Sequence, residues 1–599
     1  MKKAFVQTQI LNKEIMVRFF SFICVLAAIP LLFSCSEDFL REEPPGAAAG
    51  SVIISPDGVE AVLVGTYAYL RGRKMFGGAL CTDWTYGSTA SDDAYYGLLS
   101  TFPSIDRYEM TPSHFFLADR WRDCYEGVAR ANSTLLALSD NQKGDNPIGR
   151  QRALQIEAEA KLLRAWFHFQ ANKVFEKIPY IRTEAELYPL LPEKVPNTDS
   201  AWDQIETDLQ FAIDNLPEAP PSIEPGRLHK YAAMAVKAHA HMYQNELNKA
   251  KPLLDDIINS GRFELAPEFW HNYDMTHENN KESIFEIQAA TTSTAYCSVY
   301  PAGAAFFQKG PASCGGWGMF QPSQCLFEAF QVTDEGLPVL DIEDREPLAH
   351  DQGLASSETF VPTDHLLDPR VDWTIARRGI DFLGWGINPG NDWIREQNWG
   401  GPYMTKKYMH MKSEHALNNY GSGFYNGKNY RMYRLSNILL WRAEVAVEEG
   451  DFAKARELVN MIRTRAKNST PVMGLCTSYE NLNFNPVVDW TKPAANYMVE
   501  PYPEGHEAFS GKEEARKAVR MEIRLEFATE GHRFFDLRRW GIDDEVLNDF
   551  IARDSEFRFF MRGAVYDPEK HDYWPIPRQA VEEQKGIITQ DPAWVNVPD

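Results

Sequence analysis

The chain has 599 residues, 44% of them hydrophobic and 13% aromatic, which is too apolar for a disordered chain. Its 84 Asp and Glu residues outnumber 61 Lys and Arg, and the resulting charge of -23 repels phosphate backbones, so general nucleic-acid binding is excluded. Glycans and peptides remain open as ligands. No stretch after residue 34 is long and apolar enough to cross a bilayer.

Residues 1–34 have the pattern of a lipoprotein signal peptide. Basic residues precede a 15-residue apolar run from Phe19 to Phe33, which is shorter than a membrane-spanning helix. The run ends at Ser34-Cys35, an order that resembles a bacterial lipobox, whose cysteine is acylated and becomes the mature N-terminus. We therefore expect lipidation at Cys35 and an acidic tether over 35–55. An ordinary signal peptide with an incidental cysteine is the alternative, and Met16 is an alternative start.

Helical periodicity dominates the first half of the chain and returns near its end. Apolar residues at three- and four-residue steps predict helices over 57–71, 115–138, 152–175, 198–215, 228–246, 248–260, 430–449, 451–467 and 512–540. Two of these pairs place one alanine twelve residues before another, Ala238 before Ala250 and Ala443 before Ala455. Small residues there allow the close helix packing of a tetratricopeptide repeat. Generic antiparallel hairpins are the alternative.

Three segments, 72–114, 291–429 and 468–511, lack this periodicity and are rich in Gly, Pro, Asn and aromatic residues. Long irregular segments in folded proteins are usually functional. A glycan site needs rings that stack on sugars and polar groups that bind hydroxyls. Aromatic and polar residues occur together in two loops, 81–96 and 296–320. Our candidate ligand-binding residues in these loops are Trp84, Tyr86, Asp92, Tyr296 and Trp317. Packing in the core or contact with a partner protein would use the same rings.

A third aromatic group could extend such a site or fill a lobe of the core. It contains Trp373, Trp385, Trp393 and Trp399, with Asn388, Asn391, Asp392 and Asn398 between and beside them.

The sequence contains no clear metal or cofactor motif. None of the six cysteines after Cys35 forms a C-x-x-C pair or has a histidine at metal-ligand spacing, so we expect no metal site. Cys314 and Cys325 could form a disulfide, although buried free thiols are the simpler interpretation. Acidic residues that would suit Ca²⁺ lack the EF-hand spacing, and a solvated loop is favoured for them: Asp334, Asp341, Glu343 and Asp344.

The segment from Val519 to Gly541, VRMEIRLEFATEGHRFFDLRRWG, is similar to the C-terminal signature of SusD/RagB lipoproteins, and YWPIP from Tyr573 to Pro577 resembles their terminal motif. Further stretches of the sequence resemble the family and follow one another in the same order as in its members, so the resemblance extends over nearly the whole mature chain. It implies a mainly α fold, a right-handed superhelix of tetratricopeptide-like helix pairs with a large irregular region. Residues 56–599 would form a single unit, with a helical scaffold over 56–71, 115–290, 430–467 and 512–541 and a loop-rich ligand-binding region over 72–114, 291–429 and 468–511.

The resemblance also implies a function. Such a protein is a lipid-anchored oligosaccharide binder on the outer membrane, facing the exterior, that delivers nutrient to a SusC-like TonB-dependent transporter and catalyses no reaction. A peptide-binding member of the same family is the first alternative, and a glycosidase with two carboxylates is less favoured.

The charged residues of the C-terminal signature alternate with apolar ones. We interpret Arg520, Glu522, Arg524, Glu526 and Glu530 as scaffold residues that form ion pairs at three- and four-residue spacing, and not as catalytic acids. Gly531 is expected to end or bend this helix before Phe534 and Phe535 pack.

Overall fold

The computed structural model describes residues 50–72, 80, 82–97, 104–183, 186, 191–289, 318–417, 427–479, 482, 485–595 and 597. Cys35, Tyr296, Cys314 and Trp317 lie outside these ranges, as do the predicted signal peptide and most of the predicted tether. Within the described ranges, no helix combines the length and apolar character that crossing a membrane requires.

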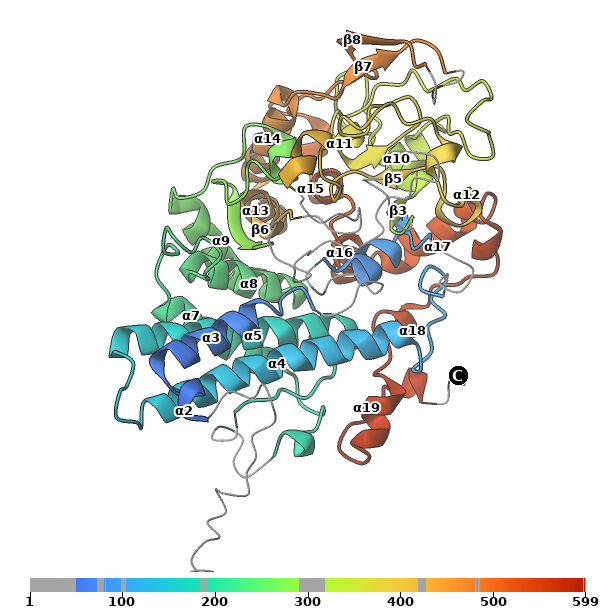
Figure 1. Ribbon diagram of the computed structural model, residues 1–599. Coiled ribbons are helices and arrows are strands. Elements are labelled where there is room, and N and C mark those ends of the chain that lie inside the picture. The colour runs from blue at the N-terminus through green and yellow to red at the C-terminus, as the bar shows by residue number, and fades with distance from the viewer. Residues whose placement is uncertain are drawn as a thin grey trace, which may run out of the picture.

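Two long helices, α4 (Phe115–Asn141) and α5 (Arg150–Phe175), lie side by side at one end of a helical stack (Figure 1). Both α3 (Pro56–Tyr67) and α7 (Trp202–Asn215) pack on α5. Because the second half of α5 is buried, its polar groups need internal partners. Arg164 therefore forms a two-pronged ion pair with Asp208 of α7, at 2.8 and 3.0 Å.

The next helix pairs are the two predicted repeats, α8 (Lys230–Tyr243) with α9 (Leu247–Asn259) and α13 (Leu435–Glu449) with α14 (Phe452–Asn468). Helix α9 packs on α13, so the two pairs stack directly although 175 residues separate them in the chain. The alanines at the predicted close contacts, Ala238, Ala250, Ala443 and Ala455, are fully buried. The predicted mainly α fold of tetratricopeptide-like helix pairs is confirmed.

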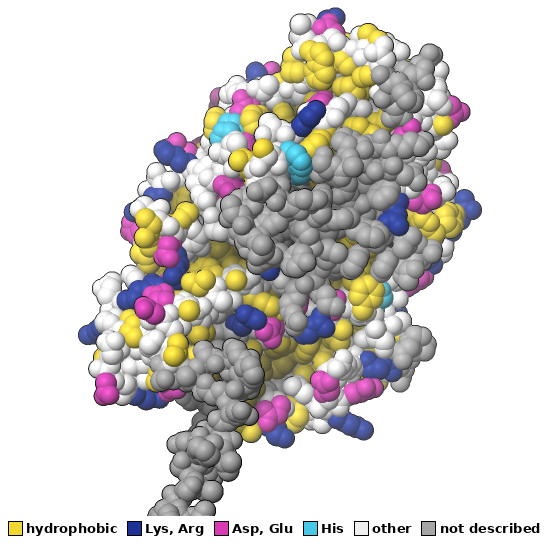
Figure 2. Space-filling model, in the orientation of Figure 1, with side chains coloured by type: hydrophobic (Ala, Val, Ile, Leu, Met, Phe, Trp, Pro, Cys, Tyr) yellow, Lys and Arg dark blue, Asp and Glu magenta, His cyan; other side chains and the backbone are white. Residues whose placement is uncertain are grey.

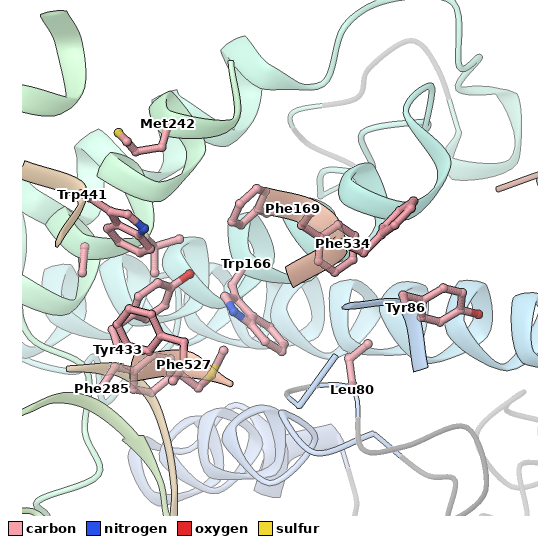
Figure 3. Packing of buried hydrophobic residues seen from close by; sticks show 14 of the residues in the cluster. Leu80, Tyr86, Trp166, Phe169, Met242, Phe285, Tyr433, Trp441, Phe527 and Phe534 are labelled. Carbon is pink, nitrogen blue, oxygen red and sulfur yellow. The ribbon is translucent and has the colours of Figure 1, made fainter. Parts of the chain in front are cut away.

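Aromatic side chains from distant segments meet in one core (Figure 3). The rings come from α5 (Trp166, Phe169), α13 (Trp441) and the C-terminal helices (Phe527, Phe534).

A short antiparallel pair of strands, β2 (Ser283–Ile287) and β6 (Tyr430–Arg434), closes one side of this core with Phe285 opposite Tyr433. The prediction of helix for 430–434 is wrong, because this segment bonds to a strand that lies far away in the sequence. The helix that follows begins at Leu435.

The C-terminal signature folds as two helices, α15 (Lys512–Phe527) and α16 (Arg533–Trp540). The turn between them holds Thr529 and Gly531 at positive φ, 66° and 81°. A Cβ atom on Gly531 would lie 2.1 Å from the carbonyl oxygen of Thr82, so only glycine fits there. The prediction of one helix over 512–540 is wrong, whereas the predicted bend at Gly531 is confirmed.

The buried charged side chains of the signature in α15, Glu522, Arg524 and Glu526, pair with other elements and not with one another. Glu522 accepts hydrogen bonds from Arg370 (2.8 Å) and Arg463 (2.9 Å), and Glu526 contacts Arg370, Arg434 and Arg465. Both glutamates are completely buried. The interpretation as scaffold ion pairs is confirmed for Glu522, Arg524, Glu526 and Glu530, whereas Arg520 lies over the ring of Trp540. The expected spacing is wrong, because these side chains point into the protein, where the charged partners belong to other segments.

The rest of the described chain consists of short elements. Six further strands form three antiparallel pairs: β1 (Ala94–Tyr95) with β3 (Gln321–Pro322), β4 (Ile375–Ala376) with β5 (Met404–Thr405), and β7 (Met473–Cys476) with β8 (Val488–Pro493). The short helices are α2 (Gly50–Ile53), α10 (Gln324–Ala329), α11 (Val371–Thr374), α12 (Gln397–Gly400), α18 (Pro568–His571) and α19 (Arg578–Glu583), and α17 (Asp543–Asp554) is longer. The predicted division into scaffold and ligand-binding regions stays a prediction.

The buried ion pairs of Glu526 predict how the free energy of unfolding depends on the charge of this carboxylate, and therefore on pH. Burial acts to raise the pKa of Glu526, but Arg465, Arg434 and Arg370 outweigh burial and hold that pKa well below its usual range. The contribution to stability is therefore present above about pH 4.5 and is lost as the pH falls toward the folded-state pKa. Glu526→Gln, which leaves buried arginines uncompensated, should lower the free energy of unfolding at pH 7 by about 3–5 kcal/mol.

Denaturant unfolding at pH 7 and pH 3 measures both effects. The difference in stability between the variant and the wild type should shrink at pH 3. Glu513→Gln is the matched control on the same helix, because its side chain is 72% exposed, and it should leave stability unchanged. Equal stability of Glu526→Gln and Glu513→Gln would contradict the role given to the buried pairs.

Candidate functional site

A cleft of about 670 Å³ is lined in part by residues of β7 and β8. These two strands lie at the end of the molecule opposite α4 and α5 (Figure 1). Hydrophobic side chains are exposed at that end (Figure 2). The volume is in the range of ordinary small-ligand sites. The cleft is lined by Trp270, Trp373, Asp381, Leu383, Gly384, Lys406, Met411, Lys412, Ser413, Thr470, Pro471, Val472, Met473 and Trp490.

Three tryptophans from three separate segments contribute to its walls. Trp270 lies in a short 3-10 helix (Phe269–Asn272) and stacks on Trp373 of α11, with ring centroids 5.7 Å apart and planes inclined by 22°. The indole Nε1 of Trp373 donates to the carbonyl oxygen of Thr470 at 3.0 Å. Trp270 and Trp373 are half-buried, and Trp490 of β8 is 57% exposed. The rings are thus held in place and still offer surface to a ligand.

Gly474 determines where the ring of Trp490 lies. The β7–β8 pairing shifts register between Met473 and Leu475, and Gly474 between them has φ +106°. A Cβ atom at this position would lie 2.7 Å from the ring of Trp490. The absence of a side chain at Gly474 therefore lets the indole lie against the backbone of β7.

Polar groups surround the rings. Lys406 is buried and its Nζ donates to the carbonyl oxygens of Asp372 and Asp381, both at 2.6 Å. Burial lowers the pKa of Lys406 to about 8, so this lysine is still mainly charged at neutral pH. The Asp381 carboxylate accepts from the backbone N–H of Gly384 at 2.7 Å. Lys412 is exposed at the rim. The cleft thus combines aromatic rings, which can stack on an apolar face, with ammonium, carboxylate and hydroxyl groups, which can hydrogen-bond to polar groups of a ligand.

The structure places Trp84 and Tyr86 in the core. They belong to a single turn of π-helix (Trp84–Thr89), where Trp84 is 1% exposed and Tyr86 is 3% exposed. Trp84 packs edge-on against Phe320 and Tyr408, with centroid distances of 4.6 and 3.7 Å. Tyr86 lies among the residues of the central core (Figure 3). Neither ring presents a surface on which a sugar could stack.

Asp92 is also buried, and its carboxylate is fully engaged. Its oxygens accept from Arg533 at 2.8 and 3.0 Å and lie 2.8 Å from Arg524. Burial acts to raise the pKa of Asp92, but the two arginines hold it below its usual range. Local sequence gave no sign of this, because the arginines follow more than 430 residues later. A ligand contact by Trp84, Tyr86 or Asp92 stays a prediction that this geometry does not favour.

The four tryptophans of the third aromatic group lie against different neighbours and do not form one cluster. Trp373 lines the cleft, whereas Trp393 packs on Phe382, Trp399 packs on Phe559 and Phe560, and Trp385 lies against His410 and His415.

Sequence reasoning missed the other two tryptophans of the cleft. Trp270 follows a helical region and carries no local signal. Trp490 stands among polar residues in Val488–Pro493, a pattern that could have indicated an exposed ring on a short strand.

Neither the cysteines nor the acidic loop belongs to a cluster suited to a metal ion among the described residues. Cys124, Cys325 and Cys476 are free thiols. Asp341 pairs with Lys517 at 2.5 Å. Side chains suited to a metal ion gather instead at two places among the described residues, Glu206 with His241 and Glu246, and His271 with Asp274 and His277.

Comparison with known proteins identifies the family. Residues 281–594 match the model of the SusD family, and residues 38–242 match a family model described as starch-binding and associating with the outer membrane. Since the first match covers more than half of the chain, the protein belongs to the SusD family, and the resemblance in its C-terminal signature is confirmed.

Among curated proteins, SusD-like protein P25 of Formosa agariphila is 23% identical over 587 residues, 95% of this chain and 98% of the relative. The fold is shared by many solved structures, among them the following two. A laminarin-binding SusD-like protein has a TM-score of 0.60 at 20% identity and covers 90% of this chain and 99% of its own. Surface glycan-binding protein A of Bacteroides thetaiotaomicron, in complex with laminarihexaose, has a TM-score of 0.61 at 18% identity, with coverages of 89% and 99%.

The position of Trp490 can be tested through Gly474. In Gly474→Ala the added methyl group should push the indole away from β7. With 5-fluorotryptophan incorporated, the ¹⁹F resonance that disappears in Trp490→Ala should shift in Gly474→Ala. Gly505→Ala is the matched control, because Gly505 also has positive φ (77°) but no atom lies within 4 Å of its added Cβ. An unshifted resonance in Gly474→Ala would show that the glycine does not position the ring.

Proposed function

We propose that this protein binds oligosaccharides through the tryptophan-lined cleft beside β7 and β8. The observation that carries the proposal is the convergence of Trp270, Trp373 and Trp490 around polar groups in one cleft. Membership of the SusD family supports it, as do the structural relatives described as binding laminarin or laminarihexaose.

The cleft would bind by stacking and hydrogen bonding, without breaking a bond. Each sugar face laid on an indole removes apolar surface from water, at about 25 cal/mol per Å². The contacts of Trp373 with Trp270 and Thr470 fix the platform before a ligand arrives, so little side-chain entropy is lost on binding. Lys412, the carboxylate of Asp381 and the hydroxyl of Ser413 are placed to select among hydroxyl patterns.

We further propose that the protein is anchored by a lipid on Cys35, faces the cell exterior and passes its ligand to a SusC-like TonB-dependent transporter. The lipobox-like sequence supports the anchor, and the family description that mentions the outer membrane supports the location. A binder that serves a transporter must release its ligand, which suits a shallow site built from stacking contacts.

Calorimetry of the mature chain against laminarihexaose and other oligosaccharides tests the cleft. For an oligosaccharide that binds, Trp373→Ala and Trp490→Ala should each weaken affinity about fivefold, corresponding to about 1 kcal/mol for one ring contact. Phe557→Ala, which removes a 55% exposed ring outside the cleft, is the control and should leave affinity unchanged.

Other outcomes separate the alternatives. Loss of affinity in Trp317→Ala, with none in the cleft variants, would move the site to the loop predicted from sequence. Binding of peptides and of no glycan would favour the peptide-binding alternative. Release of reducing ends that persists after repurification would favour a glycosidase.

The anchor has its own test. Cys35→Ala removes the only thiol that the lipobox-like sequence offers for acylation, so the variant should appear in the soluble fraction when cells are fractionated. Cys325→Ala serves as the control and should stay in the membrane fraction. Membrane retention of Cys35→Ala would contradict lipidation at this residue.

A further inference from the structure

We infer that His271, Asp274 and His277 form a binding site for a divalent transition-metal ion, with Zn²⁺ as its model occupant. One nitrogen of each imidazole and one carboxylate oxygen lie within 4.8 Å of one another. His271 lies in the short 3-10 helix Phe269–Asn272, next to the cleft, and Asp274 and His277 follow at three-residue steps in the loop after it. The sequence prediction of no metal site rested on cysteine spacing and did not consider this histidine pair.

The donor atoms define the class of ion. Two imidazoles and one carboxylate suit Zn²⁺, Co²⁺, Ni²⁺ and Cu²⁺, whereas Ca²⁺ requires six or more oxygens. Metal–ligand distances of about 2.0–2.2 Å place the donors of a tetrahedral site about 3.4 Å apart. His277 Nδ1 lies 2.6 Å from Asp274 Oδ2, a hydrogen-bond distance that must lengthen to admit an ion, and the His271 and His277 rings stack with centroids 3.5 Å apart. Because the side chain of His277 is 38% exposed, a small rotation can bring its nitrogen into place.

The loop is held in this shape by contacts on both sides. Asp274 is buried, and its Oδ1 accepts from the backbone N–H groups of Thr276 (3.1 Å) and His277 (2.8 Å), which leaves Oδ2 facing the imidazole. Arg431 donates to the carbonyl oxygens of Asn272 and His277, both at 2.5 Å. Supporting hydrogen bonds of this kind orient metal ligands and raise their affinity.

The charges around the site tolerate an added cation. Arg431 lies nearby, but its guanidinium is 3.3 Å from the carboxylate of Glu286. Glu414 accepts from the backbone N–H of Met275 at 2.6 Å and adds a second negative charge near the loop. The charge of Lys428 acts on Asp274, and the carboxylates of Glu414 and Glu278 act on Lys428 in the opposite sense to Arg431.

The second cluster, Glu206 with His241 and Glu246, differs from the first in the charges beside it. Lys249 Nζ lies 2.7 Å from Glu246 and 3.9 Å from Glu206, so this cluster already contains a cation. His241 Nδ1 lies at hydrogen-bond distance, 2.9 Å, from the carboxylate of Glu246, which is already paired with Lys249. We therefore assign a metal site only to the histidine pair at 271 and 277.

Trp270 connects the site to the cleft. Its ring centroid lies 4.3 Å from that of His271 and 5.7 Å from that of His277, and the same ring stacks on Trp373. A bound ion would link His271 to Asp274 and His277 and would thereby restrict the segment that carries Trp270. The inference does not depend on which ligand the cleft binds.

Calorimetry with ZnCl₂ on tag-free, chelator-treated mature protein tests the assignment. One ion should bind per chain, and His271→Ala and His277→Ala should each weaken that binding at least tenfold. His365→Ala, which removes an exposed histidine elsewhere, should change nothing. CaCl₂ should give no saturable binding.

A second measurement excludes a trivial loss through misfolding. The metal-free variants should melt at the wild-type temperature, and Zn²⁺ should raise the melting temperature of the wild type and of His365→Ala only. Zinc binding of equal strength in the wild type and in both cluster variants would overturn the assignment, as would the absence of saturable Zn²⁺ binding by the wild type.

Discussion

The structure depends on a group of buried ion pairs around Glu526. This carboxylate contacts Arg370, Arg434 and Arg465, and Glu282 bonds to the last two of these arginines at 3.1 and 3.2 Å. All of these groups are almost completely shielded from water. Taking charges out of water is costly unless each one is paired, so the segments that carry them can be buried only together.

These pairs also position the candidate cleft. Arg370 stands three residues before Trp373, and Arg465 lies in the last turn of α14, the helix that leads to Thr470 and β7. The second oxygen of Glu282 accepts from the backbone of Ala266 and from the side chain of Asn272, both at 2.9 Å, on either side of Trp270. The charge network therefore fixes three of the chain segments that form the cleft, and the same contacts hold the loop with the histidine pair.

Local patterns predicted most of the helices and the family. The apolar stripes around Ala238 and Ala443 located both repeat pairs, because helix packing needs small residues at regular spacing. The same reasoning failed at Tyr430–Arg434 and in the pairing of Glu522, where the partner lies on another element. The bend at Gly531 was predictable, since few residues other than glycine adopt its backbone conformation.

The sequence by itself determined the helical class, the scaffold role of the C-terminal charges and the presence of aromatic loops rich in polar residues. Only the tertiary structure decided which rings face the core and which line a cleft. Trp84 and Asp92 are buried by Tyr408, Arg524 and Arg533, which follow them by more than 300 residues. Trp490, in contrast, has one face against the backbone of β7 at Gly474 and its remaining surface exposed. Burial is a property of contacts between distant segments, and neighbouring residues in the sequence do not specify it.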